Sequence, residues 1–416
     1  MPENHVFSRR IHNRGVPSHT TMPSSTPHQE WRRIAAENQK KPRFGLAETL
    51  QRIQSNERAL THVELAGWTH LAAAALTDSL RHNHYLTRMS LQACQLGDNG
   101  LALLCPALLQ GNPPLQYLDL SGNGITDSGA VVLGRAIQHH PTLCELVLAW
   151  NGIADMGATA LAVVVKTSLA LHILDLSGVS EGRGGGSRDS FLRTENMQTV
   201  CHLGNVGCAS LAEALPFSKL VTLTLSRQHR ITATGIQALS RGLQNCQHLK
   251  HLELQRIPVD DDGAVALAGA LGSSSLLTLE LTISKISDRG AKALAHSLAS
   301  SRTPRLESLG LTQNAIGLEG LEALEAAASV NMTLQRLELY GHAAGKAGST
   351  HVWKIKPWLR MNRSSRQLLK CYCDKEHLLA HFVARVSKLP DPTRLFRVLL
   401  EIPLVFERSG CSNRIN

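Results

Sequence analysis

One short stretch near the C-terminus combines residue types that can bind a metal ion. Cys371, Cys373, His377 and His381 lie within eleven residues, and the last three share one face of a helix. Thiolates and imidazoles of this kind hold zinc in a tetrahedral site. However, the two cysteines of a Cys-x-Cys pair point in different directions on a helix, and no second ligand pair follows. We therefore expect these side chains to flank the apolar stripe of a terminal helix, and the chain to bind no metal or other cofactor.

Sequence motifs that carry catalysis are absent from the 416 residues. The chain has no G-x-S-x-G, Walker A or H-E-x-x-H motif and no paired C-x-x-C set. The glycine run at 184–186 lacks the spacing of a phosphate-binding loop. Acidic pairs such as Asp260 and Asp262 precede a predicted helix, where helix capping and the helix dipole explain them. The sequence therefore predicts a protein that is not an enzyme.

Composition and charge narrow the class of protein further. Hydrophobic residues make up 43% and aromatic residues only 4%, which indicates a core of leucine and alanine. No apolar run reaches the ~18 residues of a membrane helix, and no apolar signal segment follows the first residues. The nine cysteines, an odd number, are then expected to be reduced thiols in the cytoplasm or nucleus.

The net charge of +10 is concentrated at the two ends of the chain. Residues 1–59 carry +5 and residues 346–416 carry +9, whereas residues 60–345 carry −4. Association with nucleic acid or an anionic membrane surface would therefore involve only the ends, and nucleic acid is not the partner that we expect for the middle.

The pattern L-x-x-L-x-L recurs ten times with a nearly constant period. Successive copies are 26 to 30 residues apart, except for one step of 49 that contains an insertion at about 180–202. The copies begin at Leu60, Leu86, Leu115, Leu143, Leu171, Leu220, Leu249, Leu276, Leu306 and Leu334.

Each copy has a strand-like half and a helix-like half. Residues 115–123 alternate apolar and polar side chains, whereas residues 129–137 place apolar side chains four apart. An asparagine that follows the strand can bond the backbone of the turn, as we expect for Asn123, Asn151 and Asn314. An aspartate two residues before the helix glycine is typical of a helix N-cap, as we expect for Asp98, Asp127, Asp155, Asp261 and Asp288.

These repeats resemble the leucine-rich repeats of the ribonuclease-inhibitor type, of the form LxxLxLxxN-x-I-xDxGAxxLAxAL. The class includes ribonuclease inhibitor, the sensing arms of NOD-like receptors and the Ran GTPase-activating proteins. The resemblance covers about 60–345 and implies an α/β solenoid, a curved horseshoe with parallel strands on its concave face and helices on its convex face. It also implies a protein-binding scaffold. Regulation of a small GTPase of the Ran kind is an alternative, although many such proteins end in an acidic tail and this chain ends in a basic one.

The sequence outside the repeats predicts caps and a tail. Residues 1–28 are expected to form a disordered basic tail, with a mitochondrial targeting segment as the alternative, and 29–59 a helical N-terminal cap. Ten repeats then fill 60–345, and 346–416 form a basic helical C-terminal cap with one helix at about 375–389.

The predicted concave face carries a row of acidic side chains at the central x of L-x-L. The ten residues in this slot are Glu64, Ser90, Asp119, Val147, Asp175, Thr224, Glu253, Glu280, Gly310 and Glu338. Six of the ten are acidic. We expect them to be exposed and separated by neutral rows, except for the adjacent Glu253 and Glu280. The row is either a solvated strand face or an acidic groove for a basic protein partner. The candidate binding residues are Tyr117, Asp119, Glu145, Trp150, Asp175, Arg227, Glu253, Arg256, Glu280, Glu338 and Tyr340.

Overall fold

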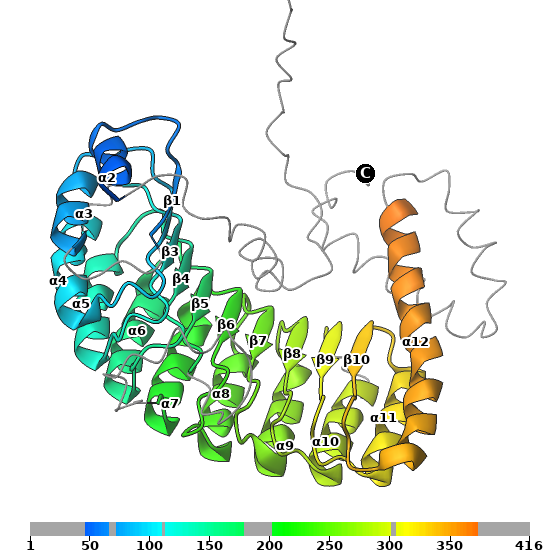
Figure 1. Ribbon diagram of the computed structural model, residues 1–416. Coiled ribbons are helices and arrows are strands. Elements are labelled where there is room, and N and C mark those ends of the chain that lie inside the picture. The colour runs from blue at the N-terminus through cyan, green and yellow to red at the C-terminus, as the bar shows by residue number, and fades with distance from the viewer. Residues whose placement is uncertain (1–45, 66–71, 110–112, 179–201, 301–304, 373–416) are drawn as a thin grey trace, which may run out of the picture. The chain divides into compact units, whose positions relative to one another are not determined.

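The computed structural model describes residues 46–65, 72–109, 113–178, 202–300 and 305–372. The elements in these ranges belong to one compact unit, Phe44–Asn416. Strands and helices alternate along this unit, and the strands lie side by side on the inner side of a curved array with the helices outside them (Figure 1). The predicted leucine-rich repeat solenoid is therefore confirmed.

The strands form one parallel sheet in which their order follows the sequence. Each is three residues long and is centred on the second leucine-type position of its repeat. The strands are β1 (His62–Glu64), β2 (Arg88–Ser90), β3 (Tyr117–Asp119), β4 (Glu145–Val147), β5 (Ile173–Asp175), β6 (Thr222–Thr224), β7 (His251–Glu253), β8 (Thr278–Glu280), β9 (Ser308–Gly310) and β10 (Arg336–Glu338).

The helices cover the other side of this sheet and contact the helices of neighbouring repeats. They are α2 (Leu46–Gln54), α3 (Ala72–Leu80), α4 (Gly97–Leu108), α5 (Asp127–Ile137), α6 (Asp155–Thr167), α7 (Asn205–Ala214) with the short η2 (Leu215–Phe217), α8 (Ala233–Gln244), α9 (Asp260–Leu271), α10 (Asp288–Ala299), α11 (Leu318–Val330) and α12 (Gly345–Tyr372).

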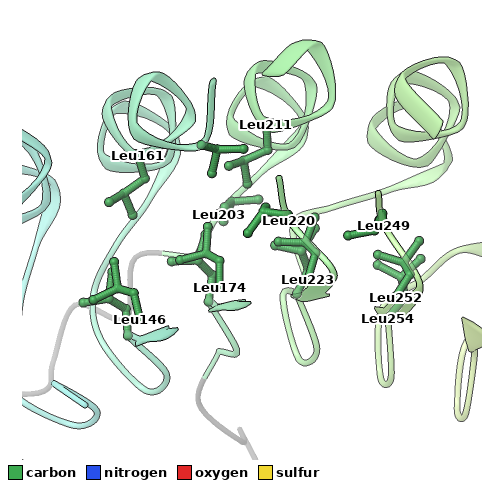
Figure 2. Packing of buried hydrophobic residues seen from close by; sticks show 14 of the residues in the cluster. Leu146, Leu161, Leu174, Leu203, Leu211, Leu220, Leu223, Leu249, Leu252 and Leu254 are labelled. Atoms are coloured by element: carbon green, nitrogen blue, oxygen red, sulfur yellow. The ribbon is translucent and has the colours of Figure 1, made fainter. Parts of the chain in front are cut away.

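The core is a set of leucine columns that run from repeat to repeat. Leu146, Leu174, Leu223 and Leu252 lie on successive strands, in register, and are at most 1% exposed. Helix leucines such as Leu161 pack against them from the outer side (Figure 2). Because each layer is covered by the next, one repeat alone could not bury its leucines, whereas a stack can.

A second column, of amides, holds the turns that follow the strands. The Asn151 Oδ1 accepts from the backbone N–H groups of Asn123 and Ile125 at 3.0 and 3.1 Å, while its Nδ2 donates to the carbonyls of Leu120 and Leu148. Asn123 and Asn314 make the same pattern of bonds, which confirms the prediction for all three. In the repeat of β6 the longer Gln228 takes this place.

The aspartates at the helix starts cap the next helix and not their own, so the predicted N-cap role is wrong in its direction. Asp127 begins α5, but its Oδ1 accepts from Ala154 N and Gly157 N at 2.7 and 2.8 Å, at the start of α6. Asp155, Asp261 and Asp288 bond the following helix in the same way, and Asp98 accepts from the backbone N–H and the hydroxyl of Thr126 at the start of α5. Parallel stacking places each aspartate beside the free N–H groups of its neighbour, so the bonds join one repeat to the next.

Between the described helices α4 and α11, this capping ladder is interrupted at α8, and the chain compensates for it locally. Ala233 begins α8 at the aspartate position and has no acceptor to offer to α9. Helix α9 is capped instead by its own Asp260, whose Oδ1 accepts from Asp262 N at 3.0 Å and Gly263 N at 3.3 Å. Asp260 adopts a left-handed backbone, with φ of 51°, to reach them.

The last described helix closes the stack. Helix α12 contacts α11, and the Asn362 Nδ2 donates to the carbonyls of Asn331 and Leu334. Within the described ranges, no helix combines the length and apolar character that a membrane crossing needs. The predicted tail at 1–28, most of the insertion at 180–202 and the predicted helix at 375–389 lie outside the described residues.

Candidate functional site

The acidic row forms one continuous line down the sheet. The strand ladder pairs its members one after another from Glu64 on β1 to Glu338 on β10, with Glu253 directly beside Glu280. The neighbouring leucines point toward the helices, so these side chains point to the opposite, inner face of the sheet. The slot that the repeat pattern defines is therefore a real row in space.

The acidic side chains on the inner strands of this row are buried, contrary to the expected exposure. Asp175, Glu253 and Glu280 are 3%, 5% and 7% exposed, whereas Glu64 and Glu338 on the edge strands keep more of their surface. Parallel strands lie about 4.8 Å apart, so a side chain on an inner strand has a neighbour on both sides. An edge strand has one neighbour only. The expectation of exposure overlooked this crowding.

Asp119 on β3 is held in one orientation by hydroxyl groups. Its Oδ1 accepts from the Ser121 backbone N–H at 2.9 Å and from the Ser121 hydroxyl at 2.6 Å, and its Oδ2 accepts from Ser90 Oγ at 3.2 Å. Burial raises the pKa of Asp119, and the bonds from Ser121 and Ser90 oppose that rise. The carboxylate is thus a fixed acceptor in a poorly solvated place.

The same device recurs two strands further along. The Asp175 Oδ1 accepts from the Ser177 backbone N–H at 2.8 Å and from its hydroxyl at 2.5 Å. Both sites share the sequence Asp-x-Ser, in which the serine follows the strand. This short signal could have identified the serines as supports, although the sequence reasoning missed it.

Tyr117, Glu145 and an arginine form a polar group beside Asp119. The Arg88 guanidinium lies 4.2 Å from the centre of the Tyr117 ring, and Tyr117 is paired in register with Glu145. Burial raises the pKa of Glu145, and Arg88 opposes this shift. Arg88 was not predicted, although it occupies the Tyr117 position of the preceding repeat.

Three carboxylates gather near the other end of the row, around Gly310. A Cβ atom on Gly310 would overlap the Glu280 carboxylate, so the Glu280 side chain leans into the space that the glycine leaves. The pKa of Glu280 is raised to about 7, chiefly by burial and then by Glu338 and Glu253, while Arg336 opposes the rise. We call Glu253, Glu280, Gly310 and Glu338 the Gly310 cluster.

The Gly310 cluster corrects a second expectation. The row on β9 was expected to separate Glu280 from Glu338 because its residue is neutral. Gly310 has no side chain to place between them, and Glu338 affects Glu280 more than the directly adjacent Glu253 does. A neutral residue separates like charges only when it has a side chain that fills its row.

Three further candidates share one turn position at the border of the row. Trp150, Arg227 and Arg256 follow β4, β6 and β7 and all adopt a left-handed backbone, with φ between 58° and 64°. Trp150 and Arg227 are half-buried and Arg256 is exposed. Tyr340, one position earlier in its repeat, is 68% exposed. These residues follow the strands at the border of the row, and they are of the aromatic and arginine types that are common in interfaces.

Other chemistry has little support in the described part of the chain. There, no group of three or more histidine, cysteine, aspartate or glutamate side chains could hold a metal ion. Cys373, His377 and His381, from the zinc-like stretch, lie outside the described residues. What the face offers is a line of fixed hydrogen-bond acceptors with a partly exposed border.

Comparisons with known proteins agree with this geometry. A model of the family described as "Leucine Rich repeat" matches residues 82–105, 111–134, 139–162, 245–268, 272–295 and 305–324. The human "NACHT, LRR and PYD domains-containing protein 5" is 31% identical over 304 residues, which are 70% of this chain and 23% of that protein. The rat "NACHT, LRR and PYD domains-containing protein 3" is 40% identical over 81 residues, 20% of this chain and 8% of that protein.

A shorter relative matches over most of its length. The "Ribonuclease inhibitor" of Sus scrofa is 28% identical over 322 residues, which cover 68% of this chain and 70% of that protein. By contrast, the chain spans about a quarter of the length of the human and bovine NACHT, LRR and PYD proteins, 23% and 24% respectively. The similarity to those proteins therefore concerns one part of them.

Proposed function

The chain is a leucine-rich repeat protein of the ribonuclease-inhibitor type, and on this premise we propose that it is a non-enzymatic scaffold that holds a protein partner against its acidic row. The partner would present donor-rich, basic side chains to the inner face of the sheet. The name of the ribonuclease inhibitor states that it acts on another protein, and we take from that relative only this mode of use.

The observation that supports this proposal is the fixation of the acidic side chains. Asp119 and Asp175 are each held by two bonds from the serine two residues later. A carboxylate that is already oriented loses little freedom when a partner binds, so more of the interaction energy remains as affinity. A merely solvated strand face would not need this support.

The border residues supply the second requirement of an interface. Tyr340 and Arg256 are exposed, and Trp150 and Arg227 are half-buried, along one edge of the row. Aromatic and arginine side chains contribute most of the binding energy in many interfaces. A partner that covers both the row and this border would combine electrostatic orientation with apolar contact.

Two alternatives from the sequence depend on other parts of the chain. Regulation of a small GTPase would appear as accelerated GTP hydrolysis in a stimulation assay. Association with nucleic acid or an anionic surface would depend on the basic ends, such as Lys354, Lys356 and Arg360 on α12. Neither alternative requires the oriented carboxylates of the inner face.

Proximity labelling with the full chain in its source cell tests the proposal. The wild type is compared with the double variant Asp119→Asn/Asp175→Asn, which keeps an acceptor oxygen for Ser121 and Ser177 but removes two charges. The control, Asp262→Asn/Glu319→Gln, removes two charges from exposed side chains on α9 and α11. Proteins labelled by the wild type and the control, but not by the Asp119/Asp175 variant, are the partners that we expect. Identical labelling by all three forms would contradict the proposal.

A further inference from the structure

In the Gly310 cluster, a buried carboxylate lies over a strand residue that has no side chain. Gly310 lies on β9 between Glu280 on β8 and Glu338 on β10, and the missing side chain opens a space in an otherwise filled row. Glu280 turns into that space, and Glu253 on β7 follows directly behind it in the ladder. The carboxylates of Glu253, Glu280 and Glu338 therefore lie in nearby rows of the inner face, close enough for Glu338 and Glu253 to raise the pKa of Glu280.

Buried polar atoms without a partner lie in the adjacent row. The Ser308 hydroxyl, two residues before Gly310 on the same face, is buried and has no hydrogen-bond partner among the described residues. The same holds for the Nδ1 of His251 and the hydroxyl of Thr222, which occupy this row on β7 and β6. Such groups are costly to bury unpaired, so they indicate that something else satisfies them.

The acidic row and the adjacent row of Ser308 together indicate which chemical group of a partner would bind here. Carboxylates only accept hydrogen bonds when ionised, and a serine hydroxyl can accept as well as donate. The matching group therefore carries several N–H donors and a positive charge. The described residues contain no set of three or more histidine, cysteine, aspartate or glutamate side chains arranged to hold a metal ion.

We infer that the Gly310 cluster binds an arginine side chain of the partner protein, with its guanidinium between Glu280 and the neighbouring carboxylates and within reach of Ser308. This inference rests on the proposed function, since it assigns a partner residue to one point of the acidic row. A guanidinium is planar and has five N–H donors, so it can serve carboxylates on two strands and a hydroxyl at once. An ammonium group has three donors that diverge from one atom and serves such a flat arrangement less well.

The charged groups around Glu280 set the pH dependence of this site. Glu253 on β7 and Glu338 on β10 raise the pKa of Glu280, Arg336 on β10 lowers it, and burial adds the largest rise, to about 7. The pKa of His251 on β7 is lowered to about 4 by burial and by Lys250, so this ring stays neutral near pH 7. A bound cation favours the ionised carboxylate, so binding releases a proton from Glu280. Affinity should be about tenfold weaker at pH 6 than at pH 8.

Peptide titrations of the full-length protein test this inference. The probes are acetyl-Gly-Arg-Gly-amide and the same peptide with citrulline, which keeps the shape of arginine and lacks its charge. Binding is followed by NMR chemical shifts of isotope-labelled protein at pH 6, 7 and 8. The arginine peptide should shift signals of β7 to β10 with the stated pH dependence, and the citrulline peptide should not. Equal binding of the two peptides would overturn the inference, whatever any variant does.

Three variants locate the site. Glu280→Gln should weaken binding at pH 8 and remove most of its pH dependence, and Gly310→Ala should weaken it by displacing the Glu280 carboxylate. Glu64→Gln is the matched control, because Glu64 occupies the same slot at the far end of the sheet. Thermal unfolding of each variant checks that it is folded. Loss of binding in Glu64→Gln equal to that in Glu280→Gln would contradict the location.

The outcomes separate this inference from the proposed function. If partners depend on Asp119 and Asp175 but the arginine peptide does not bind the Gly310 cluster, the inference fails and the proposed function stands. If the peptide binds as described but the labelling of cellular partners does not change when acidic-row residues are replaced, the cluster is a cation site and the proposed function fails.

Discussion

Replacing Glu280 with glutamine should stabilise the protein, and by more at high pH than at low pH. The pKa of Glu280 is about 7 in the folded chain, because burial and the nearby Glu338 and Glu253 disfavour its charge. In the unfolded chain the pKa of a glutamate is about 4.3. Folding therefore favours the protonated form, and the ionised form reduces stability. Glutamine keeps the shape and cannot ionise.

The size and pH range of the effect follow from that difference. Well below the unfolded pKa of about 4.3, both states hold the proton and the substitution should change little. Between about pH 4.5 and 7 the free energy of unfolding of the wild type should fall relative to the variant. Above pH 7 the gap should stay near its maximum, up to about 4 kcal/mol, since each pKa unit corresponds to about 1.4 kcal/mol.

Urea denaturation of wild type and Glu280→Gln at pH 5, 6, 7 and 8 measures this gap. Far-UV circular dichroism follows the loss of helix, and the midpoint differences are compared across pH. Glu319→Gln is the control: Glu319 is exposed on α11, and Lys292 lowers its pKa. It should not gain stability as pH rises. A Glu280→Gln gain that is the same at pH 5 and pH 8 would refute the reasoning, because it could not come from ionisation.

Three other substitutions test the columns that join the repeats. Leu252→Ala removes a side chain that is 0% exposed and should cost about 2–5 kcal/mol in urea denaturation, and a loss under about 1 kcal/mol would contradict its burial. Asp155→Ala removes the acceptor for Gly204 N and Gly207 N and should cost about 1–2 kcal/mol, with the exposed Glu213→Ala as control. Asn151→Ala leaves the N–H groups of Asn123 and Ile125 without their partner and should cost at least ~2 kcal/mol, which a shift of the urea midpoint measures.

The fold could be predicted from the sequence because one leucine pattern recurs along the chain at a nearly constant period. Ten copies of one leucine pattern define the strand centres, and the ladder pairs residues such as Leu223 and Leu252 as that pattern requires. The amide role of Asn151 also follows, because a side-chain amide in that turn has only backbone groups within reach. Each of these predictions depends on a residue type and its position in the repeat, which the sequence shows directly.

The errors concern contacts between repeats. Asp127 resembles a cap for its own helix in sequence, but its acceptor is used by Ala154 and Gly157, 27 and 30 residues later. The burial of Glu253 and Glu280 likewise depends on the rows on either side of them. A one-dimensional pattern lists the members of a row and does not show how closely the rows pack.

Acidic side chains therefore have two opposite effects in this one solenoid. Asp261, near a helix start, has its pKa lowered by bonds from Ser287 and Gly290, which outweigh its burial, so its charge strengthens the junction between repeats. Glu280 has a raised pKa, chiefly because of burial and then because of Glu338 and Glu253, so its charge weakens the fold. Stabilisation by the Asp261 type of contact is available without any ligand. At Glu280, protonation or a bound positive charge would remove the unfavourable effect of burying the ionised carboxylate. For this reason we expect a partner's arginine at the Gly310 cluster and not at the capping ladder.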